Sequence, residues 1–547
     1  MKENRKILFC LPILIILPLF LFGGDSSRDI YRQVRKNQSL INDVYRQLIT
    51  NYVDDIDIDS FTKLSINNML SELDPYTTYM EKQEKDGIEM LTKGKYGGVG
   101  IQIGIREKQL TVISPIDNSP AKRAGIISGD KIIKIDSADT KDYSIDDAAK
   151  LIRGKKGTEV VLTIKRYNDP DAIKFVLTRE NIPVKDISYF GMLDENTGYI
   201  RLNRFSRNSD KEMKAAIKSL LNENMSGLIL DLRDNPGGLL NAAVNILDLL
   251  IDKGEVLVWT KGKTSKSDRR YYSENDPIIP EDLSITVLVN QGSASASEII
   301  SGALQDLDRG VIIGRKTYGK GLVQTVFNLD RERAIKITTA KYYIPSGRLI
   351  QKPGYLPKEI LSDSSVIDTV YFTKGGRKVS GAGGITPDHV VELDEISPLL
   401  SASWRQGLFF NFVQKHKSKF SSFNEVELDT TLLNKFEDYL HSNELEIFMK
   451  GESVYLDMKE MLTALDSTSV QIQGALDILD SYFEQIALNQ FDKEREKLNH
   501  FMLLEFADFF NGEEGRIKLS SKKDKDIQKA MNILHDPVVY EKIFLPQ

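Results

Sequence analysis

The sequence predicts an α/β core that carries a β-rich module and has helical regions at both ends. Strand-like and helix-like runs alternate over residues 182–395, which favours a central sheet flanked by helices. Short β-rich runs, separated by polar and glycine-containing turns, fill residues 95–181. Helical spacing of apolar residues dominates 26–94 and 396–547. At ~100–200 residues per domain, a chain of this length holds three or four domains.

The N-terminus has the layout of a secretory signal. Lys2, Arg5 and Lys6 precede an unbroken apolar run over residues 7–22. The run is slightly shorter than the ~20 apolar residues that a membrane span needs. We therefore expect residues 1–25 to be either a cleaved signal peptide or an uncleaved membrane anchor, and the protein to be exported to the periplasm or cell envelope.

Composition excludes several classes of partner and chemistry. The formal net charge of −6 and the lack of a long basic cluster argue against a nucleic-acid partner. The single cysteine, Cys10, lies inside the apolar run. Beyond it the chain has no internal disulfide, no cysteine nucleophile and no thiolate metal site. We expect neither a metal nor an organic cofactor.

In the N-terminal region, Ile41, Val44 and Leu48 recur at helical spacing, and an Asp-Pro turn interrupts the pattern at residues 73–80. In the β-rich module we expect one helix at residues 144–152, and strands at 99–105, 109–116, 130–136, 159–167 and 173–180.

The core pattern predicts alternating strands and helices. The expected strands are 198–205, 227–234, 284–290, 310–315 and 334–344, and the expected helices are 210–222, 239–251 and 297–308. From Pro398 to the end the pattern is helical, with a charged run at 520–526 that we expect to be a loop.

The segment GSASASE, residues 292–298, joins an expected strand to an expected helix. Small residues let the backbone turn sharply there, and the helix N-terminus favours the negative charge of an oxyanion. A serine nucleophile needs a base, commonly histidine. Four of the five histidines lie in the helical C-terminal region. Only His389 fits the core, so it remains one alternative base.

A lysine can replace histidine as the base when burial lowers its pKa. Lys320 lies between Gly319 and Gly321, which leave room for close packing, and it precedes a strand-like run. Gln324 follows at an even offset, so in an extended strand it would face the same side as Lys320 and orient its amine. The segment DLRDNPGG, residues 231–238, is a strand, turn and helix start that offers backbone N–H groups for an oxyanion hole.

Taken together and in order, these motifs resemble the C-terminal processing peptidases, or tail-specific proteases, a Ser–Lys serine protease family. The resemblance spans roughly residues 40–393 and includes ITTAKYYIPSGRLIQ and GAGGITPD. It implies that Ser295 is the nucleophile, Lys320 the general base and Gln324 a supporting residue. It also implies that the N–H groups of Gly238 and Ala296 form the oxyanion hole.

The β-rich module resembles a PDZ domain. Its segment YGGVGIQIGI is similar to a carboxylate-binding loop, and successive N–H groups of Gly98, Val99 and Gly100 can form a nest for a terminal carboxylate. The strand that includes Ile101 can then pair with an extended peptide. The implied partners are proteins or peptides with free C-termini, and the implied role of the module is to select substrates and to gate the site.

The implied activity is serine endopeptidase cleavage of exported proteins. A non-catalytic PDZ scaffold is the alternative from another class, although an intact set of Ser295, Lys320 and Gln324 argues against it. Residues 396–547 lie outside the resemblance. They either form a helical domain that only buries its own apolar faces, or they mediate oligomerisation, bind an adaptor protein or cover the active site.

Overall fold

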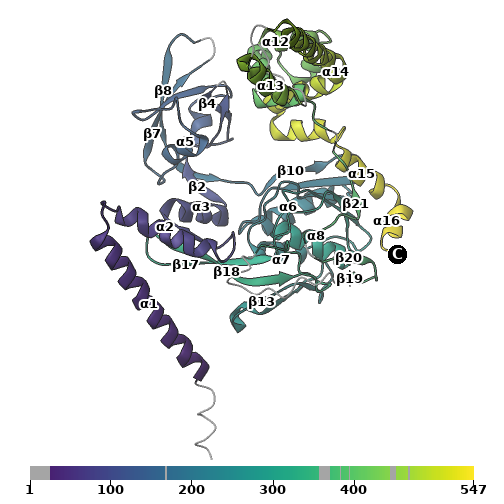
Figure 1. Ribbon diagram of the computed structural model, residues 1–547. Coiled ribbons are helices and arrows are strands. Elements are labelled where there is room, and N and C mark those ends of the chain that lie inside the picture. The colour runs from purple at the N-terminus through teal and green to yellow at the C-terminus, as the bar shows by residue number, and fades with distance from the viewer. Residues whose placement is uncertain are drawn as a thin grey trace, which may run out of the picture. The chain divides into compact units, whose positions relative to one another are not determined.

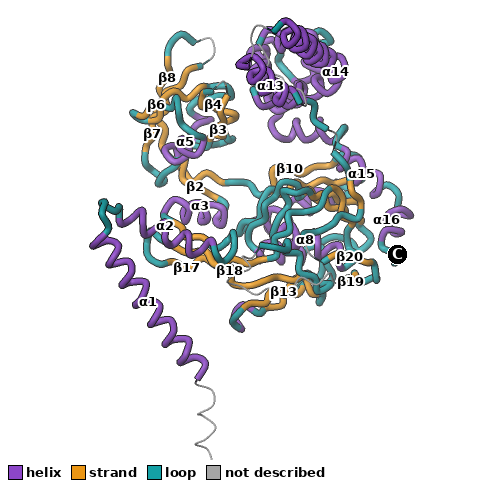
Figure 2. Tube along the Cα trace, in the orientation of Figure 1, coloured by secondary structure: helices purple, strands orange, loops and turns teal. Residues whose placement is uncertain are grey.

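The computed structural model describes residues 25–106, 108–166, 169–355, 370–381, 383–393, 395–443, 451–465 and 469–546. The chain divides into two compact units, one ending at Tyr79 and one beginning at Met80 (Figures 1 and 2). Residues 1–24 of the expected signal or anchor lie outside the described residues. Within the described part of the chain, no helix has both the length and the apolar character needed to cross a membrane.

The described part of the N-terminal unit contains two helices, α1 (Asp25–Asn51) and α2 (Ile58–Ser71). Asp57 caps α2, because its carboxylate accepts hydrogen bonds from two backbone N–H groups of the first turn. The predicted Asp-Pro turn is present, and the Asp74 carboxylate holds it by accepting a hydrogen bond from the Thr77 N–H at 2.9 Å.

The β-rich module is an antiparallel sheet with one principal helix, and its five predicted strands and the helix are confirmed. The strand order is β3-β4-β5-β7-β8, with β6 paired to β5. Alternate residues of the strands are buried, including Leu110, Val112, Leu162 and Ile164. Helix α3 (Lys82–Lys93) precedes the module. The elements that follow it are β2 (Lys95–Gly98), β3 (Ile101–Arg106), β4 (Gln109–Pro115), α4 (Pro120–Arg123), β5 (Lys131–Ile135), β6 (Ala138–Asp139), α5 (Ile145–Ile152), β7 (Glu159–Lys165), β8 (Ala172–Thr178) and β9 (Glu180–Pro183).

The core is a six-stranded sheet in the order β10-β11-β12-β15-β16-β21, parallel except for the β10–β11 pair. Helices α6, α7 and α8 connect its strands as predicted. The elements are β10 (Ile187–Met192), β11 (Thr197–Leu202), α6 (Ser209–Asn222), β12 (Gly227–Asp231), α7 (Leu240–Leu247), β15 (Ser284–Val289), α8 (Ala296–Asp306), β16 (Val311–Gly314) and β21 (His389–Val390).

Both faces of this sheet are buried, which explains the continuous apolar character of its strands. Leu228 and Leu230 of β12 pack in the cluster that contains α6, α7 and α8. Ile229, between them, packs in a second cluster with Ile527 and Ile533. The second face is therefore covered by helices from the far end of the chain.

A second antiparallel sheet lies beside the core. Strand β18 pairs with β13 and with β17, and β13 also pairs with β14. A separate two-stranded ribbon is formed by β19 and β20. The elements are β1 (Thr78–Met80), β13 (Val256–Gly262), β14 (Arg269–Tyr272), β17 (Leu322–Asn328), β18 (Ala334–Tyr343), β19 (Val370–Phe372) and β20 (Lys378–Ser380).

The C-terminal region is helical, as predicted, but its helices pack into two different hydrophobic clusters. Helices α9 to α12 and part of α14 form their own apolar cluster around Phe412, Phe436 and Phe506. Helices α15 and α16 instead cover the second face of the core sheet. The helices are α9 (Pro398–Arg405), α10 (Leu408–His416), α11 (Phe423–Leu428), α12 (Leu432–Ser442), α13 (Glu452–Leu465), α14 (Val470–Ser521), α15 (Lys525–Leu534) and α16 (Pro537–Ile543).

The loop predicted over residues 520–526 is only partly correct. Helix α14 continues to Ser521 and α15 begins at Lys525, so three residues form the turn. Helix α15 begins within the predicted loop because the Asp524 carboxylate caps it, accepting hydrogen bonds from the N–H groups of Asp526 and Ile527.

Candidate active site

Ser295 lies at the sharp turn between β15 and α8. Its φ of 55° is in the left-handed region, which few residues other than glycine adopt. Hydrogen bonds of Ser293 stabilise the turn. Its hydroxyl donates to the carbonyl of Leu232 at 2.7 Å and accepts from the N–H of Asn290 at 3.0 Å. Ser295 itself is partly exposed, whereas Ala294 and Ala296 on either side are buried. A serine at the N-terminus of α8 is therefore the accessible residue of a rigid turn.

Glu298 joins the serine turn to the lysine loop. Its buried carboxylate accepts the N–H of Ser295 at 2.8 Å and the N–H of Lys320 at 2.8 Å. It also accepts the N–H of Gly319 and the hydroxyl of Thr317. Burial raises the pKa of the Glu298 carboxyl above its usual value, and these four donors oppose that shift. In the sequence Glu298 is only the last residue of the serine motif, and no local pattern indicates this bridging position.

Tyr342 of β18 makes a second bridge between the same two segments. Its hydroxyl lies within hydrogen-bonding distance of the carbonyl of Ser295, at 3.1 Å, and of the carbonyl of Lys320, and its single proton is shared between these two acceptors. The phenol is almost fully buried, so the two contacts are protected from water. The structure therefore brings Ser295 and Lys320 together, with the backbone of each held through both its N–H and its carbonyl.

The glycines around Lys320 are required by close packing. A Cβ on Gly321 would lie 2.8 Å from the backbone nitrogen of Gln351, and one on Gly319 would lie 3.0 Å from the backbone of Gly383. Lys320 is half-buried, so it is not the freely solvated loop charge that a lysine between glycines often is.

Gln324 lies on β17, but the strand geometry used to relate it to Lys320 does not hold. The strand begins at Leu322, and its register shifts between Val323 and Gln324, so the alternation of faces is interrupted. The side-chain N–H of Gln324 donates a hydrogen bond to the hydroxyl of Thr338 at 3.3 Å. A role for Gln324 in orienting the lysine stays a prediction.

The loop after β12 lies directly against the serine turn. The carbonyl of Asn235 accepts hydrogen bonds from the N–H of Ala294 and from the hydroxyl of Ser297. A Cβ on Gly237 would lie 2.6 Å from the carbonyl oxygen of Ala294, so only glycine fits there. The motif predicts a role for Gly238 but none for Gly237, whose closeness to the serine turn depends on the tertiary fold.

The two N–H groups expected to hold an oxyanion are both available. Within the described residues, the N–H groups of Gly238 and Ala296 make no hydrogen bond to another backbone group. For Ala296 this follows from its place at the first turn of α8, where N–H groups have no intrahelical acceptor. Gly237 differs, because its N–H donates to the side chain of Asn235 at 2.9 Å.

His389 lies on the edge strand β21, which pairs with β16. Burial and the nearby cation of Lys529 lower the pKa of its imidazole. No hydrogen bond joins His389 to Ser295 in the part of the chain that the structure describes. Over the same residues, no group of three or more histidine, cysteine or acidic side chains is arranged to hold a metal ion.

The expected carboxylate-binding loop of the β-rich module joins β2 to β3. The carbonyl of Val99 accepts the N–H of Ala121, and the carbonyl of Gly100 accepts the N–H of Ile116. Among the described residues, the N–H groups of Val99 and Gly100 donate to no backbone carbonyl. Strand β3, which Ile101 begins, is an end strand of its sheet, and α5 packs beside it. An end strand of this kind can pair with an added peptide strand.

Fold and site together define a serine-type peptidase with an attached PDZ domain. The chain matches the model of peptidase family S41 over residues 196–361, a PDZ domain over 111–166, and a probable PDZ-protease C-terminal helical domain over 399–534. A carboxy-terminal-processing protease of Bartonella bacilliformis is 35% identical over 358 residues, 64% of this chain and 82% of the relative. The chain belongs to peptidase family S41, among the carboxy-terminal-processing proteases.

Two further relatives are similar over much of the chain. A probable CtpA-like serine protease of Staphylococcus aureus (strain COL) is 34% identical over 345 residues, 63% of this chain and 68% of the relative. Among solved structures, a photosystem II D1 C-terminal processing protease is 28% identical, with a TM-score of 0.36, and the match covers 64% of this chain and 86% of that one.

Proposed function

We propose that this chain is an endopeptidase of exported proteins that acts through a Ser–Lys acyl-enzyme mechanism. The observation that carries the proposal is the double bridge between the serine turn and the lysine loop. Glu298 accepts the backbone N–H of both Ser295 and Lys320, and the Tyr342 hydroxyl contacts both carbonyls. Two residues fixed in this way form a nucleophile and a base of constant separation.

In the proposed mechanism, neutral Lys320 removes the proton from Ser295, whose Oγ attacks the substrate carbonyl carbon. The N–H groups of Ala296 and Gly238 donate to the oxyanion that forms, and the helix N-terminus adds a favourable dipole. Lys320 then gives its proton to the leaving amine, and the C–N bond breaks. Water hydrolyses the resulting ester and frees Ser295. Gln324 orients the lysine amine in this scheme.

The direct test uses a fluorophosphonate probe, which reacts only with an activated serine. The full chain is kept in mild detergent because of the apolar run at residues 7–22, and the labelled peptide is identified by mass spectrometry. We expect the phosphonyl group on Ser295, together with cleavage of fluorescein-labelled β-casein. The His389→Gln variant is expected to react and cleave like the parent. Labelling of another residue would exclude Ser295 as the nucleophile, and inactivity of His389→Gln would support the Ser–His alternative.

We also propose that the PDZ domain binds substrate C-termini and gates the site. Support comes from the end strand β3, from α5 beside it, and from the N–H groups of Val99 and Gly100, which precede β3. The apolar run that follows Lys2, Arg5 and Lys6 supports export to the periplasm or cell envelope, either after cleavage of residues 1–25 or with these residues as an anchor.

A peptide pair tests the carboxylate-binding role. A peptide with a free C-terminal carboxylate is expected to bind at least about tenfold more tightly than the same peptide with a C-terminal amide. The reason is that a hydrogen bond to a charged group contributes roughly 1.5–3 kcal/mol and each 1.4 kcal/mol is tenfold in affinity. The measurement is fluorescence anisotropy with the Ser295→Ala chain, which cannot consume the peptide. Equal affinities would exclude a carboxylate-binding loop.

A further inference from the structure

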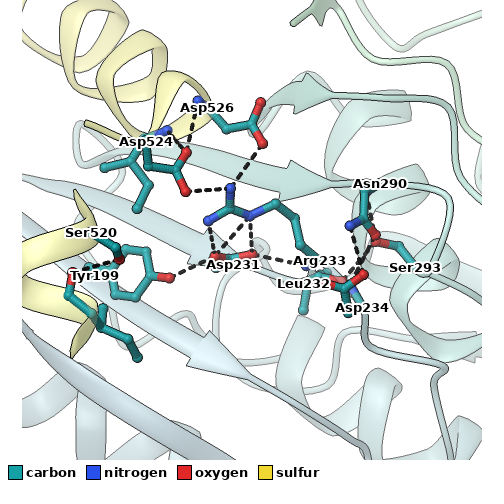
Figure 3. A network of polar contacts seen from close by, with 12 residues as sticks. Tyr199, Asp231, Leu232, Arg233, Asp234, Asn290, Ser293, Ser520, Asp524 and Asp526 are labelled. Atoms are coloured by element: carbon teal, nitrogen blue, oxygen red, sulfur yellow. Dashed lines mark hydrogen bonds and ion pairs between the residues drawn. The ribbon is translucent and has the colours of Figure 1, made fainter. Parts of the chain in front are cut away.

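A buried ion-pair network lies outside the reacting groups and includes the C-terminal helices. Arg233 contacts Asp231 at 2.6 Å, Asp524 at 2.7 Å and Asp526 at 2.9 Å. Figure 3 shows its guanidinium between Asp231 of the core and the two aspartates of the C-terminal segment. Arg315 pairs with the other oxygen of Asp526 at 2.7 Å. The network therefore joins three segments that are far apart in the sequence.

Each of the two arginines lies at the start of one of the proposed catalytic loops. Arg233 follows β12 and begins the loop that ends at Gly238. Arg315 follows β16 directly and begins the loop that ends at Lys320. Asp526 contacts both, one through each carboxylate oxygen: Oδ2 accepts from Arg233 and Oδ1 accepts from Arg315. One carboxylate of α15 thus spans the starts of the oxyanion loop and the general-base loop.

Most of the network is shielded from solvent, although the side chain of Asp524 is 23% exposed. The side chain of Asp526 is 3% exposed, that of Arg233 12% and that of Arg315 13%. Ion pairs at this depth are screened weakly, and loss of one partner leaves an uncompensated charge in the interior. Loss of Asp526 leaves Arg315 without its carboxylate partner, whereas Arg233 keeps Asp231 and Asp524. A shift of the Arg315 guanidinium toward water or another acceptor then carries the general-base loop with it and removes its link to the oxyanion loop.

The two residues next to Arg233 in the chain are hydrogen-bonded to the serine turn, so a shift of Arg233 displaces that turn. The carboxylate of the neighbouring Asp234 accepts a hydrogen bond from the side-chain N–H of Asn290 at 2.9 Å, and the backbone N–H of Asp234 donates to the side-chain oxygen Oδ1 of Asn290 at 2.9 Å. Asn290 begins the turn that holds Ser295. Leu232, on the other side of Arg233, accepts the hydroxyl of Ser293. Figure 3 shows this chain of contacts from the aspartates of α15 to the serine turn.

We propose that Asp526, supported by Asp524, is a positioning residue that fixes the oxyanion loop relative to the general-base loop, so that the C-terminal segment completes the active site. The inference rests on the proposed Ser–Lys function. It assigns α15 a part in catalysis in addition to its packing on the sheet through Ile527, Ala530 and Ile533. A C-terminal segment that is undocked, for example by a partner, would leave both loops unanchored and the peptidase inactive.

The test compares Asp526→Asn and Asp524→Asn with a matched control, Asp536→Asn. Asparagine keeps the size of each side chain and its ability to cap a helix, but it removes the charge. Asp536 caps α16 in the same C-terminal segment, with its carboxylate bonded to the N–H of Val539, and it is exposed. Kinetics of β-casein cleavage and the rate of fluorophosphonate labelling are measured on the full chain, well below each melting temperature.

We expect Asp526→Asn to lower kcat and the labelling rate by about ten- to a hundredfold, with KM changed less than about threefold, because misplaced catalytic groups reduce turnover rather than binding. Asp524→Asn should show a smaller loss in kcat, and Asp536→Asn should match the parent. A merely structural role would lower the melting temperature but leave the kcat of the folded fraction unchanged.

The outcomes separate this inference from the proposed function. If Asp526→Asn does not fold, Asp524→Asn decides, since it leaves the buried Asp526 in place. Parental kcat in every folded aspartate variant, with Ser295→Ala inactive, would overturn the inference and leave the proposed function standing. A parent chain that neither cuts β-casein nor reacts with the probe would overturn both.

Discussion

Ser295→Ala and Lys320→Ala are each expected to abolish peptide hydrolysis, and the double variant is expected to be no slower than the slower single one. The two residues act as one unit, because the serine is unreactive until the lysine removes its proton. Removal of the nucleophile from a serine protease costs on the order of 10⁶ in kcat, and removal of a general base ~10²–10⁴. Initial rates of β-casein cleavage by the three variants measure the effect.

Lys316→Ala is the matched control for this prediction. Lys316 lies in the same loop and has the same kind of side chain, but it is exposed. It should therefore keep parental kcat. Melting curves should show all four variants folded, since Ser295 and Lys320 are held by backbone contacts to Glu298 and Tyr342 that alanine retains. Additive losses in the double variant would mean that Lys320 is not the base for Ser295.

Gly237→Ala is expected to lower kcat by about 10²–10³, similar to the loss of one oxyanion donor. The added Cβ would lie 2.6 Å from the carbonyl oxygen of Ala294, 2.8 Å from the nitrogen of Ala296 and 2.8 Å from the Cβ of Ser295. These atoms belong to the nucleophile turn, which must shift to admit the methyl group. The shift moves the Ala296 N–H away from the oxyanion and destabilises the fold by about 1–3 kcal/mol.

Gly254→Ala separates this clash from backbone strain. Gly254 has a φ of 96°, close to the 94° of Gly237, but nothing lies within 4 Å of the position of its Cβ. It should lose roughly 1–2 kcal/mol of stability through the positive φ alone and keep parental kcat. Steady-state kinetics and thermal melts on both variants give the comparison. Equal kcat in Gly237→Ala and Gly254→Ala would show that the nucleophile turn tolerates displacement.

The sequence by itself determined the order of modules and most elements of the core. Alternating runs between residues 182 and 395 predicted strands β11, β12, β15, β16 and β18, and helices α6, α7 and α8, because a parallel sheet needs apolar strands and crossover helices that can be recognised locally. The motifs, in their order along the chain, predicted Ser295 as the nucleophile and Lys320 as the general base. Strands such as β13 and β14, without equally distinct local patterns, were not predicted.

Only the tertiary structure decided how distant segments meet at the site. Glu298, Gly237 and Tyr342 carry no local signal of their roles, since each acts through contacts with residues remote in the chain. The even-offset argument for Gln324 failed for a similar reason, because the register shift in β17 is set by pairing with β18.

The charged run at 520–526 shows the limit most clearly. By composition it is a solvated loop, and three of its residues do form a turn. Yet Asp526 is buried against Arg233 and Arg315, which lie more than two hundred residues earlier. Charge in a sequence predicts exposure unless a partner of opposite sign compensates it in the interior, and such a partner is supplied only when the chain folds.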